Sequence, residues 1–307
     1  MRGPRVDRFG LAENVIGPAE LRKLQLRELR VLDDFARLCD EHGLQYYLVF
    51  GTLLGAMRHE GFIPWDDDLD VAMPREDYRR FAQLISANLD DRYRLQSQDL
   101  DAAWPYRFSK LSLRGTRIEV VAGAEESFGR GIGLDIFPLD GVPESRGGRM
   151  LRRVVVRLMN MSLSSRRSVR RRRRRMRWVA FWFRLIPPAL ISSVFGWTTR
   201  RWRTTDCGTW FCPGPYRSMD FPSDWFGDGE QFKFEGLMLN GPVRADDYLT
   251  SIYGDYMTPL PPEQRLGHGI LTVDFGGPAV EEDLGEVERS LAPLRLMAPS
   301  AGSFEPE

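Results

Sequence analysis

Hydrophobic and polar residues recur with different periods along the chain, and the changes of period indicate helices interleaved with strands. Residues 18–42 place apolar side chains on one helical face, with Glu28 as the one polar interruption, and they predict a long helix. Residues 45–50 are aromatic and β-branched, which is typical of a buried strand. Gly51 ends this strand, and Thr52 is placed to cap a short helix.

The same alternation continues through the rest of the chain. A strand over residues 66–73 leads into a helix that begins after Pro74. The later elements are three strands, a hairpin turning at Asn240-Gly241 and one more helix: residues 106–113, 116–121, 134–138, 234–243 and 246–253. This order predicts an α/β (α+β) fold in which helices flank a mixed sheet.

Charge divides the chain into two unequal parts. The 307 residues include 43 basic and 43 acidic side chains, so the formal net charge is zero. Residues 145–205, however, hold 18 arginines and no acid, which leaves a balance of −18 on the remainder (43 − 18 = 25 basic against 43 acidic). An ordinary share of apolar and charged residues argues against both wholesale disorder and a multi-span membrane protein.

The basic segment is open to three interpretations. Between Arg166 and Trp197, a run of nine arginines in residues 166–177 precedes a block rich in Trp and Phe. In the first interpretation the segment binds an anionic membrane surface, which would accept both the arginines and the aromatic block. In the second it is a helical insert packed on the rest of the protein. Nucleic-acid binding is less expected, because no recognised nucleic-acid module surrounds the arginines. A transmembrane span is disfavoured by Arg184 and the double proline at 187–188.

The cysteines and the N-terminal residues bear on location. Three cysteines cannot form a disulfide framework, which fits a reducing compartment. Residues 1–17 lack the continuous apolar run of a signal peptide. We therefore expect a cytoplasmic protein, with peripheral attachment at the inner face of the cell membrane as the role of the basic segment.

The most informative chemistry lies in residues 51–70. Asp66, Asp68 and Asp70 are spaced by two, so on a strand they share one face, while Asp67 and Leu69 point away. Carboxylates this close repel one another unless a cation neutralises them, and oxygen ligands suit Mg²⁺ or Mn²⁺. An acidic surface turn is the simpler interpretation, but the apolar residues that precede and interrupt the run favour a half-buried strand.

Residues 46–81 resemble the signature of the LicD family, which includes phosphorylcholine transferases and is similar to the fukutin group. The family pattern is a Gly-Ser/Thr turn after a strand, a DxD pair on the next strand and a third carboxylate on a later one. Gly51-Thr52 matches the turn, and Asp68 and Asp70 match the pair. The third carboxylate falls on Asp135, while Asp140 is a weaker candidate for it and Asp66 extends the acidic row.

Other parts of the chain extend the resemblance. Residues 106–111 followed by Thr116 are similar to the family's FxKL…T segment, in which Lys110 would meet donor phosphate. Residues 248–259 are similar to the block around YGDYM, and Arg265 and His268 follow where the family often has an Arg and a His. The substrate-binding residues that this implies are Gly51, Thr52, Arg58, Lys110, Thr116 and His268.

The resemblance implies a nucleotidyltransferase-like fold of the polymerase-beta superfamily. Residues 18–144 would form the catalytic core, 145–205 a basic helical insert, 206–296 the C-terminal part of the catalytic domain and 297–307 a flexible tail. The implied activity moves phosphocholine or a polyol phosphate from a CDP-activated alcohol to a hydroxyl of a glycan or lipid-linked glycan.

Asp68, Asp70 and Asp135 are the catalytic residues that the resemblance implies, and with Asp66 they would hold Mg²⁺ or Mn²⁺. Two alternatives stay open. A nucleotidyltransferase acting on a small molecule or protein would use the same carboxylates. A non-catalytic membrane-surface scaffold would use the basic insert as its contact.

Overall fold

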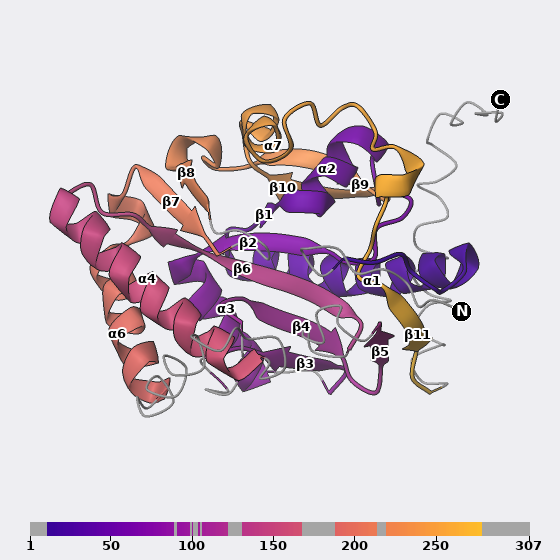
Figure 1. The fold of residues 1–307 in the computed structure, drawn as a ribbon, viewed down its shortest axis with the longest axis horizontal. Coiled ribbons are helices and arrows are strands. Elements are labelled where there is room, and N and C mark those ends of the chain that lie inside the picture. Colours follow the sequence, from indigo (N-terminus) through magenta and orange to yellow (C-terminus); the bar gives the residue numbers. More distant parts are fainter. Residues whose placement is uncertain are drawn as a thin grey trace, which may run out of the picture.

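The chain folds into one large mixed sheet with helices packed against it, as the computed structural model in Figure 1 shows. The structure describes residues 11–88, 91–98, 100, 104, 106–121, 131–167, 188–213 and 219–277. The expected tail, 297–307, and most of the arginine run lie outside the described residues. The α/β class expected from the sequence is confirmed.

The large sheet has the strand order β1-β2-β6-β4-β3, and β7 and β8 extend it from the end of β6. Its central pair, β2 and β6, is parallel, and its other neighbours are antiparallel. The strands are β1 (Tyr47–Leu48), β2 (Asp70–Pro74), β3 (Tyr93–Gln96), β4 (Ser109–Leu113), β6 (Gly133–Gly141), β7 (Thr209–Cys212) and β8 (Met219–Pro222). Every residue of β2, β4 and β6 is buried, so these strands form the centre of the core.

Two antiparallel pairs lie beside this sheet. One joins β5 (Arg117–Val120) to β11 (Ile270–Asp274), and the other joins β9 (Glu230–Phe234) to β10 (Leu237–Gly241). The α-helices are α1 (Pro18–His42), α2 (Phe50–His59), α3 (Arg75–Asn88), α4 (Arg146–Arg167), α6 (Pro188–Arg201) and α7 (Ala245–Tyr253). The part of the chain that the structure describes also contains three short 3₁₀ helices, η1 (Thr204–Asp206), η2 (Ser223–Trp225) and η3 (Pro262–Gln264). Among the described residues, no helix is both long and apolar enough to cross a membrane.

The long helix α1 forms for the reason that its sequence indicates. Its apolar face supplies Leu24, Leu32 and Phe35 to the core, where Phe35 meets the rings of Tyr46 and Phe81 edge-on. The helix lies across β6 and β4. It ends at Gly43, whose backbone is left-handed (φ +58°) and whose N–H returns to the last turn.

Several expected boundaries are wrong. The strand expected over residues 66–73 begins only at Asp70, and the residues before it form an irregular segment. Thr52 lies inside α2, whose N-cap is Val49. The β9–β10 hairpin turns at Glu235-Gly236 rather than at Asn240-Gly241, and Glu235 takes a left-handed φ of +51° there.

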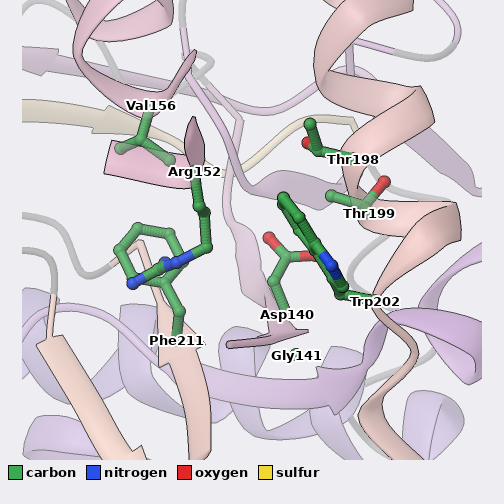
Figure 2. Close-up of a pocket in the computed structure, with 8 residues that line it drawn as sticks. All are labelled: Asp140, Gly141, Arg152, Val156, Thr198, Thr199, Trp202 and Phe211. Atoms are coloured by element: carbon green, nitrogen blue, oxygen red, sulfur yellow. The ribbon is translucent and has the colours of Figure 1, made fainter. Parts of the chain in front are cut away.

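The helices α4 and α6 of the basic segment lie side by side at one end of the molecule (Figure 1). Figure 2 shows a small cavity, partly open to solvent, between these helices and the sheet. Arg152 from α4 and Thr198 and Thr199 from α6 line it together with Asp140 and Phe211. The cavity therefore marks where the two helices join the core. Residues 168–187, which connect the helices, lie outside the described residues.

Candidate active site

Acidic residues from separate elements meet where the parallel strands β2 and β6 begin. Asp70 opens β2 and is the register partner of Asp135 on β6. Lys110 on β4 is the register partner of Asp135 from the other side, and its Nζ lies 3.0 Å from Asp135 Oδ1. All three side chains are buried. The sheet register thus places two carboxylates and one ammonium group together in the core.

The segment before β2 brings further carboxylates to this place. Asp66 lies against the start of α2, because a Cβ at Gly51 would come within 2.9 Å of Asp66 Oδ2. The Gln25 side chain donates to the Asp66 carbonyl at 2.9 Å and holds the segment on α1. Asp67, expected to point away from its neighbours, is instead fully buried and contacts His268. The expectation failed because this segment is not a strand.

His268 completes the cluster from a distant part of the chain. Its Nδ1 lies 2.7 Å from Asp67 Oδ1, and its backbone N–H donates to Asp67 Oδ2 at 2.9 Å. Its Nε2 is 3.8 Å from Asp68 Oδ2. Asp67 therefore orients the imidazole so that Nε2 faces Asp68, an arrangement common behind metal-ligating histidines.

The loop around His268 is held tightly in place. Ala12 and Gly267 exchange backbone hydrogen bonds of 2.9 and 3.1 Å, and Asn14 Oδ1 accepts from the Ile270 N–H at 2.8 Å. A Cβ at Gly267 would come within 2.7 Å of Asp67 Oδ2, so only glycine permits this approach. Gly269, on the other side, is left-handed at φ +70°. The glycines on both sides of His268 are a sequence signal that could have marked it.

The electrostatics of the cluster are those of crowded carboxylates. Burial, reinforced by neighbouring carboxylates, raises the pKa of Asp66, Asp68 and Asp70 above the ordinary value. Burial also raises the pKa of Asp135, although Lys110 opposes this effect. The ionised forms of these carboxylates are therefore disfavoured, and a bound cation would stabilise them.

The carboxylates stabilise the charged forms of the two basic residues in the cluster. Burial alone would lower the pKa of His268, but Asp67 and Asp68 outweigh it and raise that pKa well above the usual range. The pKa of Lys110 is likewise raised, because Asp135 outweighs burial. For Asp67, the charge and hydrogen bonds of His268 outweigh burial and lower the pKa.

The donor set fits a divalent cation. One ligand atom each from Asp67, Asp68 and His268 lies within 4.8 Å of the others. Carboxylates with an imidazole suit Mg²⁺, Mn²⁺ or similar ions. The raised pKa values of Asp66 and Asp70 point the same way, since a bound cation would oppose both the burial and the carboxylate repulsion that raise them.

Thr52 and Thr116, which were also expected at the site, make hydrogen bonds to the backbone. Thr52 is buried, and its Oγ1 accepts the Asp70 N–H at 2.7 Å, so it positions the start of β2. Thr116 Oγ1 donates to the Leu113 carbonyl at 2.8 Å and accepts from the Ile132 N–H at 3.0 Å. Its hydrogen bonds thus stabilise the turn after β4.

Arg58 stands at the rim of the cluster. Its Nη1 donates to the Tyr256 carbonyl at 3.0 Å. Burial and the nearby Arg265 lower its pKa, whereas Asp66 acts to raise it. Arg265 in turn lies over the ring of Trp65, 4.6 Å from its centre. Arg58 is therefore close enough to Asp66 for the two charges to interact, and Arg265 lies near Arg58.

Two residues near the cluster were not expected as site residues. Glu28 is buried, and burial followed by Asp68 raises its pKa well above the usual range. Within the described residues its Oε2 has no hydrogen-bond partner. Its position as the one polar interruption on the apolar face of α1 was the sequence signal that could have marked it as a site residue. Tyr253 at the end of α7 is 43% exposed, and desolvation followed by the charges of Asp70 and Asp66 raises its pKa.

Carboxylates and a lysine on the central strands of a mixed α/β sheet, with a histidine from a neighbouring loop, form an arrangement suited to an enzyme that acts on phosphate groups. Residues 43–150 match the family model described as "LicD/FKTN/FKRP, nucleotidyltransferase domain". Residues 43–150 are therefore similar to the LicD family, and the resemblance noted in the sequence is confirmed.

Named relatives agree with this assignment. The chain is 28% identical to the lipopolysaccharide cholinephosphotransferase LicD of Haemophilus influenzae over 266 residues, which cover 80% of this chain and 95% of that protein. It is 41% identical to human ribitol 5-phosphate transferase FKRP over 63 residues, or 19% of this chain and 13% of that protein. An uncharacterised Rickettsia typhi protein is 36% identical over 76 residues, or 23% of this chain and 25% of that protein. By this relationship the protein is an enzyme of the transferase class.

Proposed function

We propose that the protein is a metal-dependent transferase that moves a phospho-alcohol group, phosphocholine or a polyol phosphate, from a CDP-activated alcohol to a hydroxyl of a glycan or lipid-linked glycan. The observation that carries the proposal is the meeting of Asp68, Asp70 and Asp135 beside Lys110 and His268. The relatives named for cholinephosphate and ribitol 5-phosphate transfer support the class of group transferred.

Asp66, Asp68, Asp70 and Asp135 would hold Mg²⁺ or Mn²⁺, with His268 Nε2 as a further ligand beside Asp68. When bound, the ion supplies charge stabilisation for phosphate oxygens during transfer. In the reaction the acceptor oxygen bonds to the phosphorus that carries the alcohol. The bond from that phosphorus to cytidine monophosphate breaks, and the acceptor hydroxyl loses its proton.

The chain's own residues have separable tasks in this reaction. Lys110 balances Asp135 and presents an ammonium group to the donor phosphates. Arg58 and Arg265 at the rim attract the diphosphate electrostatically. Asp67 positions His268, while a carboxylate of the cluster accepts the acceptor's proton.

Asp68→Asn tests the proposal. The substitution keeps the shape of the side chain, so the variant should fold as the wild type does and lose at least ~100-fold in transfer. Mass spectrometry after incubation with CDP-choline, CDP-ribitol or CDP-glycerol, an acceptor glycan and Mn²⁺ measures the product. Asp40→Asn, at an exposed position on α1, is the matched control and should keep full activity.

The same assay distinguishes the alternatives. A nucleotidyltransferase would consume CTP or ATP and leave a nucleoside monophosphate on its product, which has a different mass. A scaffold would show no product with either donor class, and metal and nucleotide would leave its melting temperature unchanged. Near-full activity in purified Asp68→Asn protein would contradict the mechanism.

A further inference from the structure

One face of α4 exposes apolar side chains in helical register. Met150, Val154 and Leu158 follow one another at intervals of four, with exposed fractions of 69%, 46% and 41%. Residues four apart lie above one another on a helix, so these side chains form one row. Exposed apolar groups in a row differ from the scattered ones found on most protein surfaces.

A second row, of arginines, runs beside the first. Arg149, Arg153 and Arg157 each precede a member of the apolar row by one position, and all three are exposed. The outer face of α4 thus joins a cationic row to an apolar row along the helix. This is the arrangement of helices that lie flat in a membrane interface.

The opposite face of α4 holds the helix to the core. Arg152 is buried, lies over the Phe211 ring at 4.5 Å, and donates to both carboxylate oxygens of Asp220 at 2.9 and 3.1 Å. Val155 is also buried, and Figure 2 shows Arg152 and Val156 facing the cavity. The inner contacts fix which face of α4 remains outside.

The neighbouring helix α6 has exposed residues of the same two kinds. Trp197 is 55% exposed, and Val194 is exposed as well. Arg200 and Arg201, in the last turn, are exposed cations. Tryptophan is the side chain that most favours the boundary between headgroups and acyl chains. Both helices therefore present the same chemistry.

Charge indicates the partner. Residues 145–205 contain no acidic residue, so nothing within this segment neutralises the exposed arginines. A second copy of the chain that docked through the same face would bring the same positive charge to the contact. A nucleic acid would satisfy the arginines and leave the apolar row without a partner. An anionic bilayer satisfies both rows at once, because its headgroups pair with the arginines and its acyl region accepts the apolar side chains.

We propose that the outer face of α4, with the exposed residues of α6, docks the protein on an anionic phospholipid membrane. The helix lies parallel to the surface, with Met150, Val154 and Leu158 directed into the interface and the arginine row at headgroup level. The docking surface consists of described residues and is separate from the acidic cluster.

Vesicle co-sedimentation of the full-length protein tests this proposal. Vesicles of phosphatidylcholine with about 30 mol% phosphatidylglycerol are compared with vesicles of phosphatidylcholine alone, at moderate salt. The wild type should bind the anionic vesicles and not the neutral ones. The triple variant Arg149→Glu, Arg153→Glu, Arg157→Glu should bind at least ~100-fold more weakly, since each lost cation near the surface weakens binding by roughly five-fold.

The control carries the same change of net charge elsewhere: Arg37→Glu, Arg94→Glu, Arg117→Glu, at three exposed arginines outside α4 and α6. It should keep more than half of the wild-type binding. A second test variant, Met150→Ser, Val154→Ser, Leu158→Ser, should lose at least ~10-fold in binding while its charge stays unchanged. Circular dichroism confirms that each variant is folded.

Three outcomes would overturn the proposal. The wild type fails to bind anionic vesicles, or the α4 arginine variant binds as the control does, or the protein prefers single-stranded RNA to the vesicles at the same salt. Metal binding at the acidic cluster, followed by thermal shift, is measured on the same samples. Its presence or absence bears on the proposed transferase and not on the docking surface.

Discussion

Thr52 shows how a single side chain can position part of the site. The hydroxyl is buried and accepts the N–H of Asp70, the first residue of β2. The Gly51-Thr52 pair was expected at donor phosphate. In the structure Gly51 provides the space in which the Asp66 carboxylate lies. Together the two residues fix the backbone of one carboxylate and the side chain of another.

Thr52→Val should destabilise the protein by about 1–3 kcal/mol, because the buried Asp70 N–H loses its acceptor while the shape of the side chain is kept. Thr52→Ser retains the hydroxyl and should recover most of the loss. Urea unfolding followed by tryptophan fluorescence measures both variants. Equal stability of the valine and serine variants would show that the hydrogen bond contributes little.

Asp70→Asn should raise the melting temperature of the metal-free protein. Asp70 is buried beside Asp68 and Asp135, and burial and these two charges raise its pKa, so a neutral side chain of the same shape relieves the repulsion. The same variant should respond less to Mn²⁺ than the wild type does. Differential scanning calorimetry in EDTA and then in Mn²⁺ checks both statements, and a lower melting temperature in EDTA would contradict the first.

At the scale of elements, a buried ion pair joins α3 to the end of β6. Arg75, the first residue of α3, donates through Nε and Nη2 to the two carboxylate oxygens of Asp140, at 2.6 and 2.9 Å. Asp140 was the weaker of the two candidates for the third carboxylate. In the structure it pairs with Arg75, whereas Asp135 lies next to Asp70. The pair holds the helix that follows β2 against the strand parallel to it.

Arg75→Met should destabilise the protein by roughly 3–5 kcal/mol, since it leaves the Asp140 carboxylate buried without its partner. The double variant Arg75→Met, Asp140→Leu removes both charges and should regain much of that stability. Urea denaturation of the two variants and the wild type provides the comparison. A double variant as unstable as Arg75→Met would indicate that the pair itself, rather than the orphaned carboxylate, matters.

The sequence could predict elements whose stabilising contacts are local in the chain or whose hydrophobic pattern extends over many residues. The face of α1 and the apolar run of β6 are of this kind, and so is the end of α7 at Gly254. The strand predicted over residues 66–69 is absent because the conformation of these residues depends on distant partners, the Gln25 side chain and His268. The spacing of the aspartates predicted that they lie together, but it could not show that Asp67 turns inward to the His268 imidazole.

At the scale of the whole molecule, the acidic cluster draws on parts of the described chain that lie far apart in the sequence. Glu28 comes from α1, Lys110 from β4, Asp135 from β6 and His268 from the loop before β11. A cation held there would bind the folded chain and not the unfolded one. Metal binding and global stability should therefore be linked.

Mn²⁺ at about 100 times its dissociation constant should stabilise the wild type by ~2.7 kcal/mol. Asp68→Asn should show little or none of this stabilisation, and Asp40→Asn should show all of it. Thermal unfolding across a series of Mn²⁺ concentrations measures the effect. A rise in melting temperature that is the same for all three proteins would mean that Mn²⁺ acts elsewhere.

The contact between Asp67 and His268 spans 201 positions of the chain. On the ribosome, the aspartates are made long before the histidine that faces them, at a pace of roughly 5–20 residues per second. A nascent chain therefore spends on the order of ten seconds or more with its carboxylates made and their imidazole partner still missing. The cluster is complete only when synthesis has passed residue 268, so the ability to hold a cation would reveal whether a given molecule has been made beyond that residue and has folded.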